Sequence, residues 1–291
     1  MHTQGDSAYL PTRDGRSLHA AVLRGPDDAP IVVFEAGAAA SRSTWAAVQP
    51  AVAGFATAVA YDRSGLGRSA PDPVARTLDR MADDLNDLLD GLGAERRFVL
   101  VGHSAGGPIV RLAASRRPER IAGLVLVDPT DEAADVLFGR AFKAVETVTI
   151  AVFGALARFG LLGRLFRAQF AGAPADVRAD AEREAFTTGV IETQARQAKT
   201  FLTEVRRWRD SPPALGDIAV TVISGAKNGD GMPASVRAAA NASHEARAQA
   251  SPRGRHVLAP NSGHYVPLTD PELIVEEIRR IAIATPAGDG R

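Results

Sequence analysis

Short apolar runs alternate with turn signals and amphipathic stretches from the start of this chain to Asp128. This alternation is typical of strands that feed helices onto a mostly parallel sheet. It predicts an α/β fold in which a mostly parallel, twisted sheet has helices on both faces. We expect strands at Leu18–Leu23, Ile31–Glu35, Thr57–Tyr61, Phe98–Val101, Leu124–Asp128, Val220–Ser224 and His256–Ala259.

The alternation stops after Asp128, and a different composition follows. About eighty residues have helical character, with many alanines and arginines and no convincing strand, until Pro212 and Pro213 end the pattern. The shift predicts two parts. They are a core made of 1–130 and 211–291, and a helical cap at 131–210 that is inserted into it.

Two further segments are expected to be helices of the core. Apolar residues recur at helical spacing between Leu78 and Leu92, and Asp83, Asp84, Asp87 and Asp90 fall mostly on the opposite side. That spacing predicts a solvated helix face rather than a metal site. A last helix is expected at Pro271–Ile283, followed by a frayed tail at 285–291.

Charge and motif content exclude several classes of function. The chain carries 34 basic and 34 acidic side chains, and it contains no cysteine. A nucleic-acid binder depends on clustered basic residues, so a nucleic-acid partner is not expected. The lack of cysteine excludes disulfides, thiolate metal sites and a thiol nucleophile. The signatures of zinc proteases, phosphate-binding loops and dinucleotide folds are also missing, so neither a metal nor a cofactor is expected.

No targeting or membrane segment stands out. Residues 1–7 lack the basic start and apolar stretch of a signal peptide, and the most apolar window, Ile150–Phe170, is interrupted by Arg158, Arg164 and Arg167. We therefore expect a cytoplasmic protein with a small-molecule substrate and no membrane partner. Only three basic residues are lysines and alanine is abundant, which favours a bacterial source. The sequence predicts no particular oligomeric state.

A glycine-rich turn around Ser104 carries the strongest chemical signal. The run Gly102-His103-Ser104-Ala105-Gly106 directly follows the apolar run Phe98–Val101 and directly precedes the helix-like segment Pro108–Ser115. This strand-turn-helix setting is what a nucleophile elbow requires, with small residues that let neighbouring backbone approach a strained serine. The helix amino end then favours the negative charge that develops during acyl transfer.

On these residues the chain resembles the α/β-hydrolases, over most of its length except the predicted cap. The segment Val33–Ala38 resembles their oxyanion loop, with Gly37 at the family's glycine and Ala38 at the position whose backbone N–H faces the oxyanion. Ala36 stands where the family frequently has histidine. The resemblance implies that the backbone N–H groups of Ala38 and Ala105 stabilise the oxyanion.

Two further segments match the family's order along the chain. The run Asp62-Arg63-Ser64-Gly65-Leu66-Gly67-Arg68-Ser69 resembles its D-x-x-G-x-G-x-S signature, which is structural in character. The run Asn261-Ser262-Gly263-His264 resembles the loop that bears the catalytic histidine.

His264 is also the best candidate for the base when the six histidines are compared directly. His2 is terminal, His19 and His256 belong to strands, His103 is fixed beside the nucleophile, and His244 lies in a polar stretch. His264 follows a strand through a loop, from which an imidazole can reach the carboxyl ends of the strands. A serine hydroxyl needs such an adjacent base to become a useful nucleophile.

The acid of a Ser-His-Asp triad has two candidates. Asp128 ends the strand Leu124–Val127, a position from which some branches of the family take their acid. Asp230 lies near the place where most of the family keeps it, although Asn228 occupies the expected offset. The sequence favours Asp128 and leaves Asp230 open.

Together these features predict a serine hydrolase that cleaves a small, largely apolar carboxylic ester through an acyl-enzyme. The serine argues against the branches with an aspartate nucleophile, the haloalkane dehalogenases and epoxide hydrolases. Lactonase, amidase, carbon-carbon bond hydrolase and cofactor-free perhydrolase activities share the same residues, and the fold also hosts non-catalytic small-molecule-binding proteins. An apolar roof over the substrate is expected from Leu156, Phe159, Leu161, Leu162, Leu165, Phe166 and Phe170, and Trp45 and Trp208 are candidates for lining the pocket.

Overall fold

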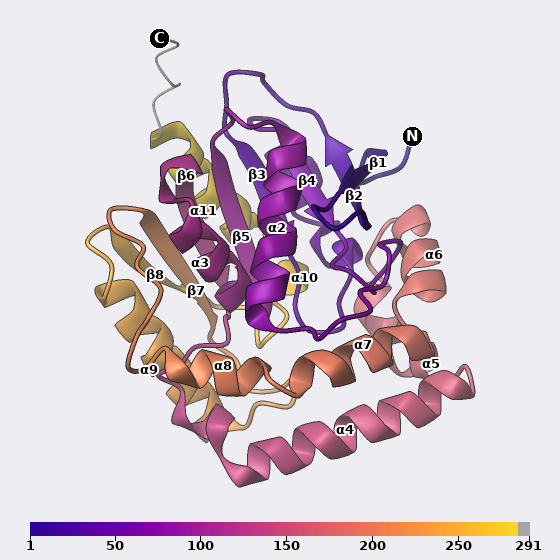
Figure 1. Ribbon diagram of the computed structural model, residues 1–291. Helices are drawn as coiled ribbons and strands as arrows, with labels where there is room; N and C mark the ends of the chain where they lie inside the picture. The colour runs from indigo at the N-terminus through magenta and orange to yellow at the C-terminus, as the bar shows by residue number, and fades with distance from the viewer. Residues whose placement is uncertain (285–291) are drawn as a thin grey trace.

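The structure of the protein is a computed structural model that describes residues 1–284. Its strands form one sheet. Its strands are β1 (Asp6–Pro11), β2 (Ser17–Leu23), β3 (Ile31–Glu35), β4 (Ala58–Tyr61), β5 (Phe98–His103), β6 (Ile121–Val127), β7 (Ala219–Gly225) and β8 (Gly254–Ala259). They lie side by side in the order β1-β2-β4-β3-β5-β6-β7-β8 (Figure 1). The strands β3 to β8 pair in parallel, whereas β2 is antiparallel to both β1 and β4.

The predicted mostly parallel sheet is confirmed, and each of the seven expected strands is present. The strand β1 was missed. It lies at the edge of the described sheet, where it pairs with β2 alone, and its Tyr9 is 59% exposed. An edge strand of this kind buries little apolar surface, so its sequence carries a weak hydrophobic pattern. The predicted frayed tail, 285–291, lies outside the described residues.

Helices cover both faces of the sheet. They are α1 (Gln49–Val52), α2 (Leu78–Leu92), α3 (Gly106–Arg116), α4 (Arg140–Arg158), α5 (Leu162–Phe166), α6 (Ala175–Glu184), α7 (Thr188–Ala198), α8 (Phe201–Arg207), α9 (Ala234–Gln249), α10 (Val266–Thr269) and α11 (Pro271–Ala284). Short 3₁₀ helices occur at η1 (Arg42–Trp45), η2 (Pro118–Arg120), η3 (Asp135–Phe138) and η4 (Arg167–Phe170). Apolar side chains of α2 and α3 pack on one face of the sheet, and those of α1 and α11 pack on the other.

The aspartates of α2 form only part of the solvated face that their spacing predicts, since Asp90 is exposed and Asp83 is half-buried. Asp84 and Asp87 are buried, and each pairs with an arginine of the turn that joins β1 to β2. The Arg16 Nη2 lies 2.5 Å from Asp84 Oδ1, and the Arg13 Nη2 lies 2.7 Å from Asp87 Oδ1. The turn covers these two carboxylates and excludes water from them. The two ion pairs therefore hold the turn against α2. Among residues 1–284, no group of three or more His, Asp or Glu side chains is arranged to hold a metal ion.

We call residues 131–210 the cap. The helices η3 to α8 lie in this segment, between β6 and β7 in the chain. Figure 1 shows α4, α7 and α8 running below the sheet, with α7 and α8 nearer to it and α4 on the outside. Apolar side chains of α4, α5 and α7 form a small cluster of their own, to which Leu66 of the core contributes. The cap is therefore packed on its inner side.

The helix α4 is rich in apolar residues, but it does not meet the criteria for a membrane-spanning helix. Within residues 1–284, no single helix has the length and hydropathy needed to cross a bilayer. Only α4 taken together with Leu162–Phe170 reaches that length and composition, and the two parts are bent by 112°.

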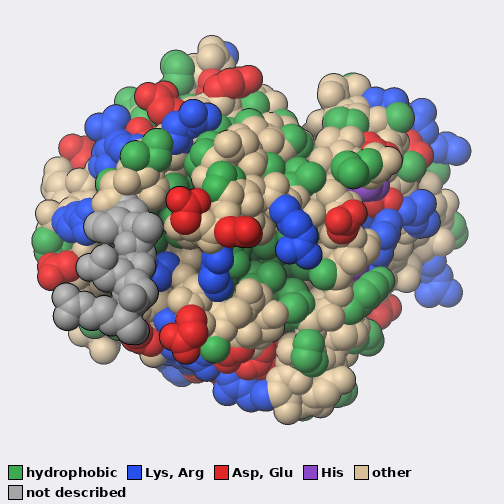
Figure 2. All heavy atoms as spheres, turned by 90° about the horizontal axis from the view of Figure 1, so that it is seen from above, with side chains coloured by type: hydrophobic (Ala, Val, Ile, Leu, Met, Phe, Trp, Pro, Cys, Tyr) green, Lys and Arg blue, Asp and Glu red, His purple; other side chains and the backbone are tan. Residues whose placement is uncertain are grey.

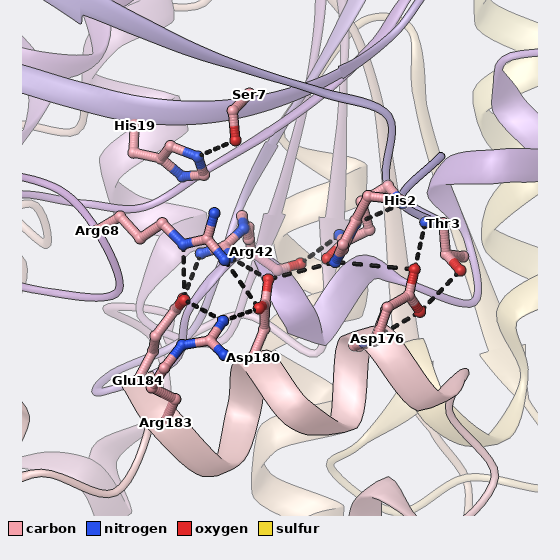
Figure 3. Close-up of polar contacts among 12 residues, drawn as sticks. His2, Thr3, Ser7, His19, Arg42, Arg68, Asp176, Asp180, Arg183 and Glu184 are labelled. Carbon is pink, nitrogen blue, oxygen red and sulfur yellow. Dashed lines mark hydrogen bonds and ion pairs between the residues drawn. The ribbon is translucent and has the colours of Figure 1, made fainter.

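Buried charges hold α6 of the cap against the core (Figure 3). The Arg42 side chain is 1% exposed, and its Nη1 donates to Asp62 of the core at 2.6 Å and to Glu184 of α6 at 2.7 Å. Its Nη2 donates to Asp180, and His19 contributes a further contact to Asp62. Burial opposes ionisation of Asp62, but the His19 hydrogen bond and the Arg42 charge outweigh it and lower the Asp62 pKa.

Replacing Arg42 should therefore cost much more stability than replacing an exposed arginine of the same network. We expect Arg42→Met to lower the free energy of unfolding by about 3–5 kcal/mol, because it leaves buried carboxylates without a cation. The matched control is Arg183→Met, since the Arg183 side chain is 59% exposed and such a pair contributes about 1 kcal/mol or less. Urea denaturation of the two variants measures both values, and equal losses would contradict this account.

The same pair predicts the direction of a pH effect. The Asp62 pKa is lowered in the folded chain, so its contribution is complete above the ordinary aspartate pKa of about 4 and is lost as the pH falls further. The difference in unfolding free energy between the wild type and Arg42→Met should shrink below about pH 4. A difference that stays constant from pH 7 to pH 3 would argue against the pair.

Candidate active site

Ser104 lies at a sharp turn between β5 and α3. Its φ angle is 53°, in the left-handed region that side chains other than glycine rarely adopt. A Cβ atom added to Gly102 would lie 2.7 Å from the Gly106 carbonyl oxygen, and one added to Gly106 would lie 2.6 Å from the Glu35 carbonyl oxygen. These glycines let the backbone segments pack closely enough to present the Ser104 hydroxyl at the carboxyl end of the sheet.

His264 connects the serine to a carboxylate. Its Nε2 lies 3.0 Å from the Ser104 Oγ, and its Nδ1 lies 2.6 Å from the Asp128 Oδ2. A proton on Nδ1 donates to the carboxylate, which leaves the Nε2 lone pair free to accept the serine hydroxyl. The three side chains come from the ends of β5 and β6 and from the loop between β8 and α10. They form one continuous hydrogen-bonded line.

Asp128 is held from several sides. Its φ angle is 42°, and its Oδ1 accepts the Gly225 N–H at 3.1 Å and the Arg237 guanidinium at 2.5 Å. Burial opposes ionisation of Asp128, but the His264 hydrogen bond, the neighbouring imidazoles and Arg237 hold its pKa well below the usual range. Asp128 is therefore a carboxylate that stays charged beside the imidazole.

Asp230 contacts the same histidine in a different way. Its Oδ2 accepts the backbone N–H of His264 at 3.0 Å. A Cβ atom on Gly263 would lie 2.4 Å from that carboxylate oxygen, so the glycine makes room for it. The structure thus brings both candidate acids to His264, with Asp128 on the ring and Asp230 on the backbone.

His103 has a positioning contact that the sequence did not suggest. Its Nε2 lies 2.9 Å from the His264 carbonyl oxygen, and the two rings pack with centroids 4.8 Å apart. Complete burial, together with the nearby His264 charge, lowers the His103 pKa to about 3. The neutral ring donates its N–H to the carbonyl and braces the loop that carries His264.

Ala38 and Ala105 both lie beside Ser104. The N–H groups of Ala38 and Ala105 meet no acceptor in the part of the chain that the structure describes, and both residues line a pocket with Ser104. The loop that carries Ala38 is held by Arg63, whose guanidinium donates to the carbonyl oxygens of Ala36 and Gly37. The sequence marked the segment around Arg63 as structural but did not reveal this clamp.

Ser104 opens onto two pockets. The larger, about 280 Å³, contains His264 and is roofed by aromatic side chains of the cap. The smaller, about 150 Å³, shares Ala38, Ser104 and Gln194 with the larger one and lies on the side of Ala105. Among the described residues that line the larger pocket, none is Asp, Glu, Lys or Arg. The cap supplies Phe153, Leu162, Phe166, Gln169, Phe170, Ala185, Phe186, Ile191 and Gln194.

The expected apolar roof is correct only in part. Leu162, Phe166 and Phe170 line the larger pocket, and Leu156 packs in the apolar cluster of the cap. Phe159, Leu161 and Leu165 are instead 74%, 38% and 59% exposed. Phe159 and Leu161 lie in the connection between α4 and α5, and Leu165 lies on the exposed side of α5.

Neither tryptophan lines the two pockets beside Ser104. Trp45 is fully buried against Phe34 in the core. Trp208 packs under the Arg111 guanidinium, 4.9 Å from the ring centroid. Their packing roles explain why large aromatic side chains occur at these positions.

Comparisons with known proteins identify the family of the chain. A family model described as the alpha/beta hydrolase family matches residues 32–277. An AB hydrolase superfamily protein of Gibberella zeae is 27% identical over 289 residues, which covers 87% of this chain and 86% of the relative. In several other curated relatives, the matching region spans less than half of the relative's own length.

Two solved structures share the fold at low sequence identity. The epoxide hydrolase CorEH superposes with a TM-score of 0.74 at 20% identity, over 96% of this chain and 99% of that one. A thermophilic esterase from Thermogutta terrifontis superposes with a TM-score of 0.70 at 22% identity, over 97% and 99%. The α/β-hydrolase fold expected from the sequence is thus confirmed.

The strained turn at Ser104 makes a prediction that does not depend on activity. Ser104→Gly should be more stable than Ser104→Ala by about 1 kcal/mol, because glycine adopts a φ angle near +53° without a Cβ clash. At Ser115, which lies in α3, the order should reverse, since alanine is favoured over glycine in a helix by about 1 kcal/mol. Urea denaturation of the four variants measures both differences. If the glycine and alanine variants had the same order of stability at both sites, the turn at Ser104 would not be strained.

Proposed function

The chain belongs to the alpha/beta hydrolase family, and from that premise we propose that it is a serine hydrolase that cleaves a small, largely apolar carboxylic ester. The observation that carries the proposal is the hydrogen-bonded line from Ser104 Oγ to His264 Nε2, at 3.0 Å, and from His264 Nδ1 to Asp128 Oδ2, at 2.6 Å. A base in contact with the hydroxyl, and a carboxylate that orients the base, are the two requirements for an activated serine.

In the proposed reaction, His264 Nε2 takes the hydroxyl proton as the Ser104 Oγ attacks the acyl carbon. The carbonyl oxygen becomes an oxyanion, and the free N–H groups of Ala38 and Ala105 donate hydrogen bonds to it. The tetrahedral intermediate collapses, and His264 returns the proton to the departing alcohol oxygen. Water then attacks the acyl-enzyme with His264 again as the base, which releases the acid and restores Ser104.

Asp128 is the proposed acid of the triad, and Asp230 is a positioning residue. The Asp128 carboxylate holds the Nδ1 proton and stabilises the imidazolium that forms when His264 takes the serine proton. Its lowered pKa keeps it charged across the neutral range. Asp230 contacts only the backbone N–H of His264, so it orients the loop and not the proton of the ring.

The larger pocket supports an apolar group on the substrate. Phe166 stacks against Phe186 with ring centroids 5.7 Å apart, and Phe153 and Phe170 meet this pair edge-on. A charged substrate group would lose its hydration there without gaining a partner, because the lining contains no Asp, Glu, Lys or Arg. The alcohol part of the ester is therefore proposed to be uncharged and apolar.

Covalent labelling tests the nucleophile. A fluorophosphonate should modify the wild-type chain once, and the adduct should map to the peptide that contains Ser104, because the probe reacts with base-activated serines. Ser104→Ala should not be labelled, whereas Ser115→Ala, a matched change on α3, should react at the wild-type rate. Equal labelling of the wild type and Ser104→Ala would refute the proposal.

Substitution of each aspartate separates the two acids. On one activated ester, Asp128→Asn should lower kcat by about four orders of magnitude, because the orienting carboxylate on the ring is lost. Asp230→Asn should lower it by at most about a hundredfold, the factor that corresponds to one hydrogen bond to a charged group. Thermal unfolding of each variant separates a slower reaction from a lost fold. If Asp230→Asn lowered kcat as much as Asp128→Asn does, the assignment of Asp128 as the acid would be wrong.

A further inference from the structure

The two pockets at Ser104 lie on chemically different sides of the nucleophile. The departing alcohol must receive its proton from His264, so it leaves on the side where His264 lies. His264 lines the larger pocket, and the smaller pocket contains Ala38, Ser104 and Ala105 without it. The smaller pocket is therefore the side on which the acyl group extends. This assignment rests on the proposed function.

A single carboxylate lies in the wall of the smaller pocket. Glu146 projects from α4 beside Leu137, Phe142, Phe201 and Leu202. Within residues 1–284, its carboxylate has no hydrogen-bond or ion-pair partner. Burial raises its pKa, and the charge of Lys143, one turn away, only partly opposes this. An unpaired carboxylate among apolar side chains is costly unless a ligand pairs with it.

The placement of Glu146 is the reverse of what packing alone favours. On α4, Val145, Val148 and Val152 are 65%, 62% and 49% exposed, while Glu146 is half-buried on the side that faces the pocket. A surface helix normally turns its valines inward and its glutamates outward. Stability of the folded chain does not account for a carboxylate turned inward at this position.

A second acceptor in the same place also lacks a donor. The Oε1 of Gln194, on α7, is buried and has no hydrogen-bond partner in the described part of the chain. Gln194 lies where the two pockets meet at Ser104. Buried acceptors of this kind are rare in folded proteins unless a ligand or water completes them. Glu146 and Gln194 therefore both lack a donor, and a ligand in the smaller pocket that carries N–H groups would satisfy them.

We propose that the smaller pocket is a subsite for a short acyl chain that ends in a cationic, N–H-rich group such as a primary ammonium. The ammonium donates to the Glu146 carboxylate and to the Gln194 amide oxygen, and its methylene groups pack against Leu137, Phe142, Phe201 and Leu202. A cavity of 150 Å³ has the volume of about five water molecules, which restricts the acyl chain to a few carbons. The preferred substrate is then an ω-aminoacyl ester of an apolar alcohol.

Pairs of isosteric esters test the subsite. Phenyl 3-aminopropanoate is compared with phenyl butanoate, and phenyl 6-aminohexanoate with phenyl heptanoate, so that an ammonium replaces a methyl group in each pair. The wild type should prefer at least one amino ester by about tenfold or more in kcat/KM, the factor that corresponds to a hydrogen bond to a charged group. Glu146→Gln should lower the ratio of kcat/KM between the amino ester and its neutral partner by about tenfold or more, which removes the preference.

A matched control and three outcomes make the test decisive. Glu182→Gln removes an exposed carboxylate from α6 of the cap and should keep the wild-type preference, which separates a local contact from a change in net charge. Hydrolysis of the neutral esters without preference for either amino ester would overturn the subsite alone. A preference that Glu146→Gln retains would do the same. No hydrolysis of any ester, together with an unlabelled Ser104, would overturn the proposed function and the subsite with it.

Discussion

The geometry of the site depends on two residues that directly follow neighbouring parallel strands. Both have the left-handed backbone conformation, although neither is glycine. Ser104 follows β5 with φ 53°, and Asp128 follows β6 with φ 42°. The ladder continues past the strand ends, since Ser104 N–H donates to the Val127 carbonyl and Asp128 N–H donates to the Ile223 carbonyl. Each residue is thus fixed by the next strand of the sheet, which is how a packed structure retains a strained backbone. His264 needs only to bridge two side chains whose positions are already set.

Buried arginines fix several of the segments around the site. Arg42 joins the core to α6 of the cap, Arg237 holds the far side of Asp128, and Arg63 clamps the loop that carries Ala38. Each guanidinium satisfies several acceptors at once, which suits its planar set of donors. Glu146 is the contrast, because it is turned inward without a cation. The buried carboxylates discussed above each have an arginine or histidine partner, whereas the half-buried Glu146 lines a pocket.

Much of this structure could be predicted from the sequence, and the failures have physical causes. The strands β3 to β7 are buried along their whole length, and such strands read as apolar runs in the sequence. The turn at Ser104 follows from the small residues that come directly after one of these runs. The buried state of Asp84 and Asp87 could not be predicted, since their partners Arg16 and Arg13 lie 68 and 74 positions away. The sequence also could not show how Asp128 and Asp230 each contact His264. Both reach His264, and only geometry separates a contact to the ring from a contact to the backbone.

The central claim is that Ser104 carries the acyl group during turnover. The most direct measurement is peptide mapping by mass spectrometry after a rapid acid quench of the wild-type chain with p-nitrophenyl butanoate. The account predicts a butanoyl group on the peptide that contains Ser104 within the first turnover, and no adduct on Ser104→Ala. Hydrolysis at the wild-type rate by Ser104→Ala, or an acyl group mapped to another residue, would contradict it.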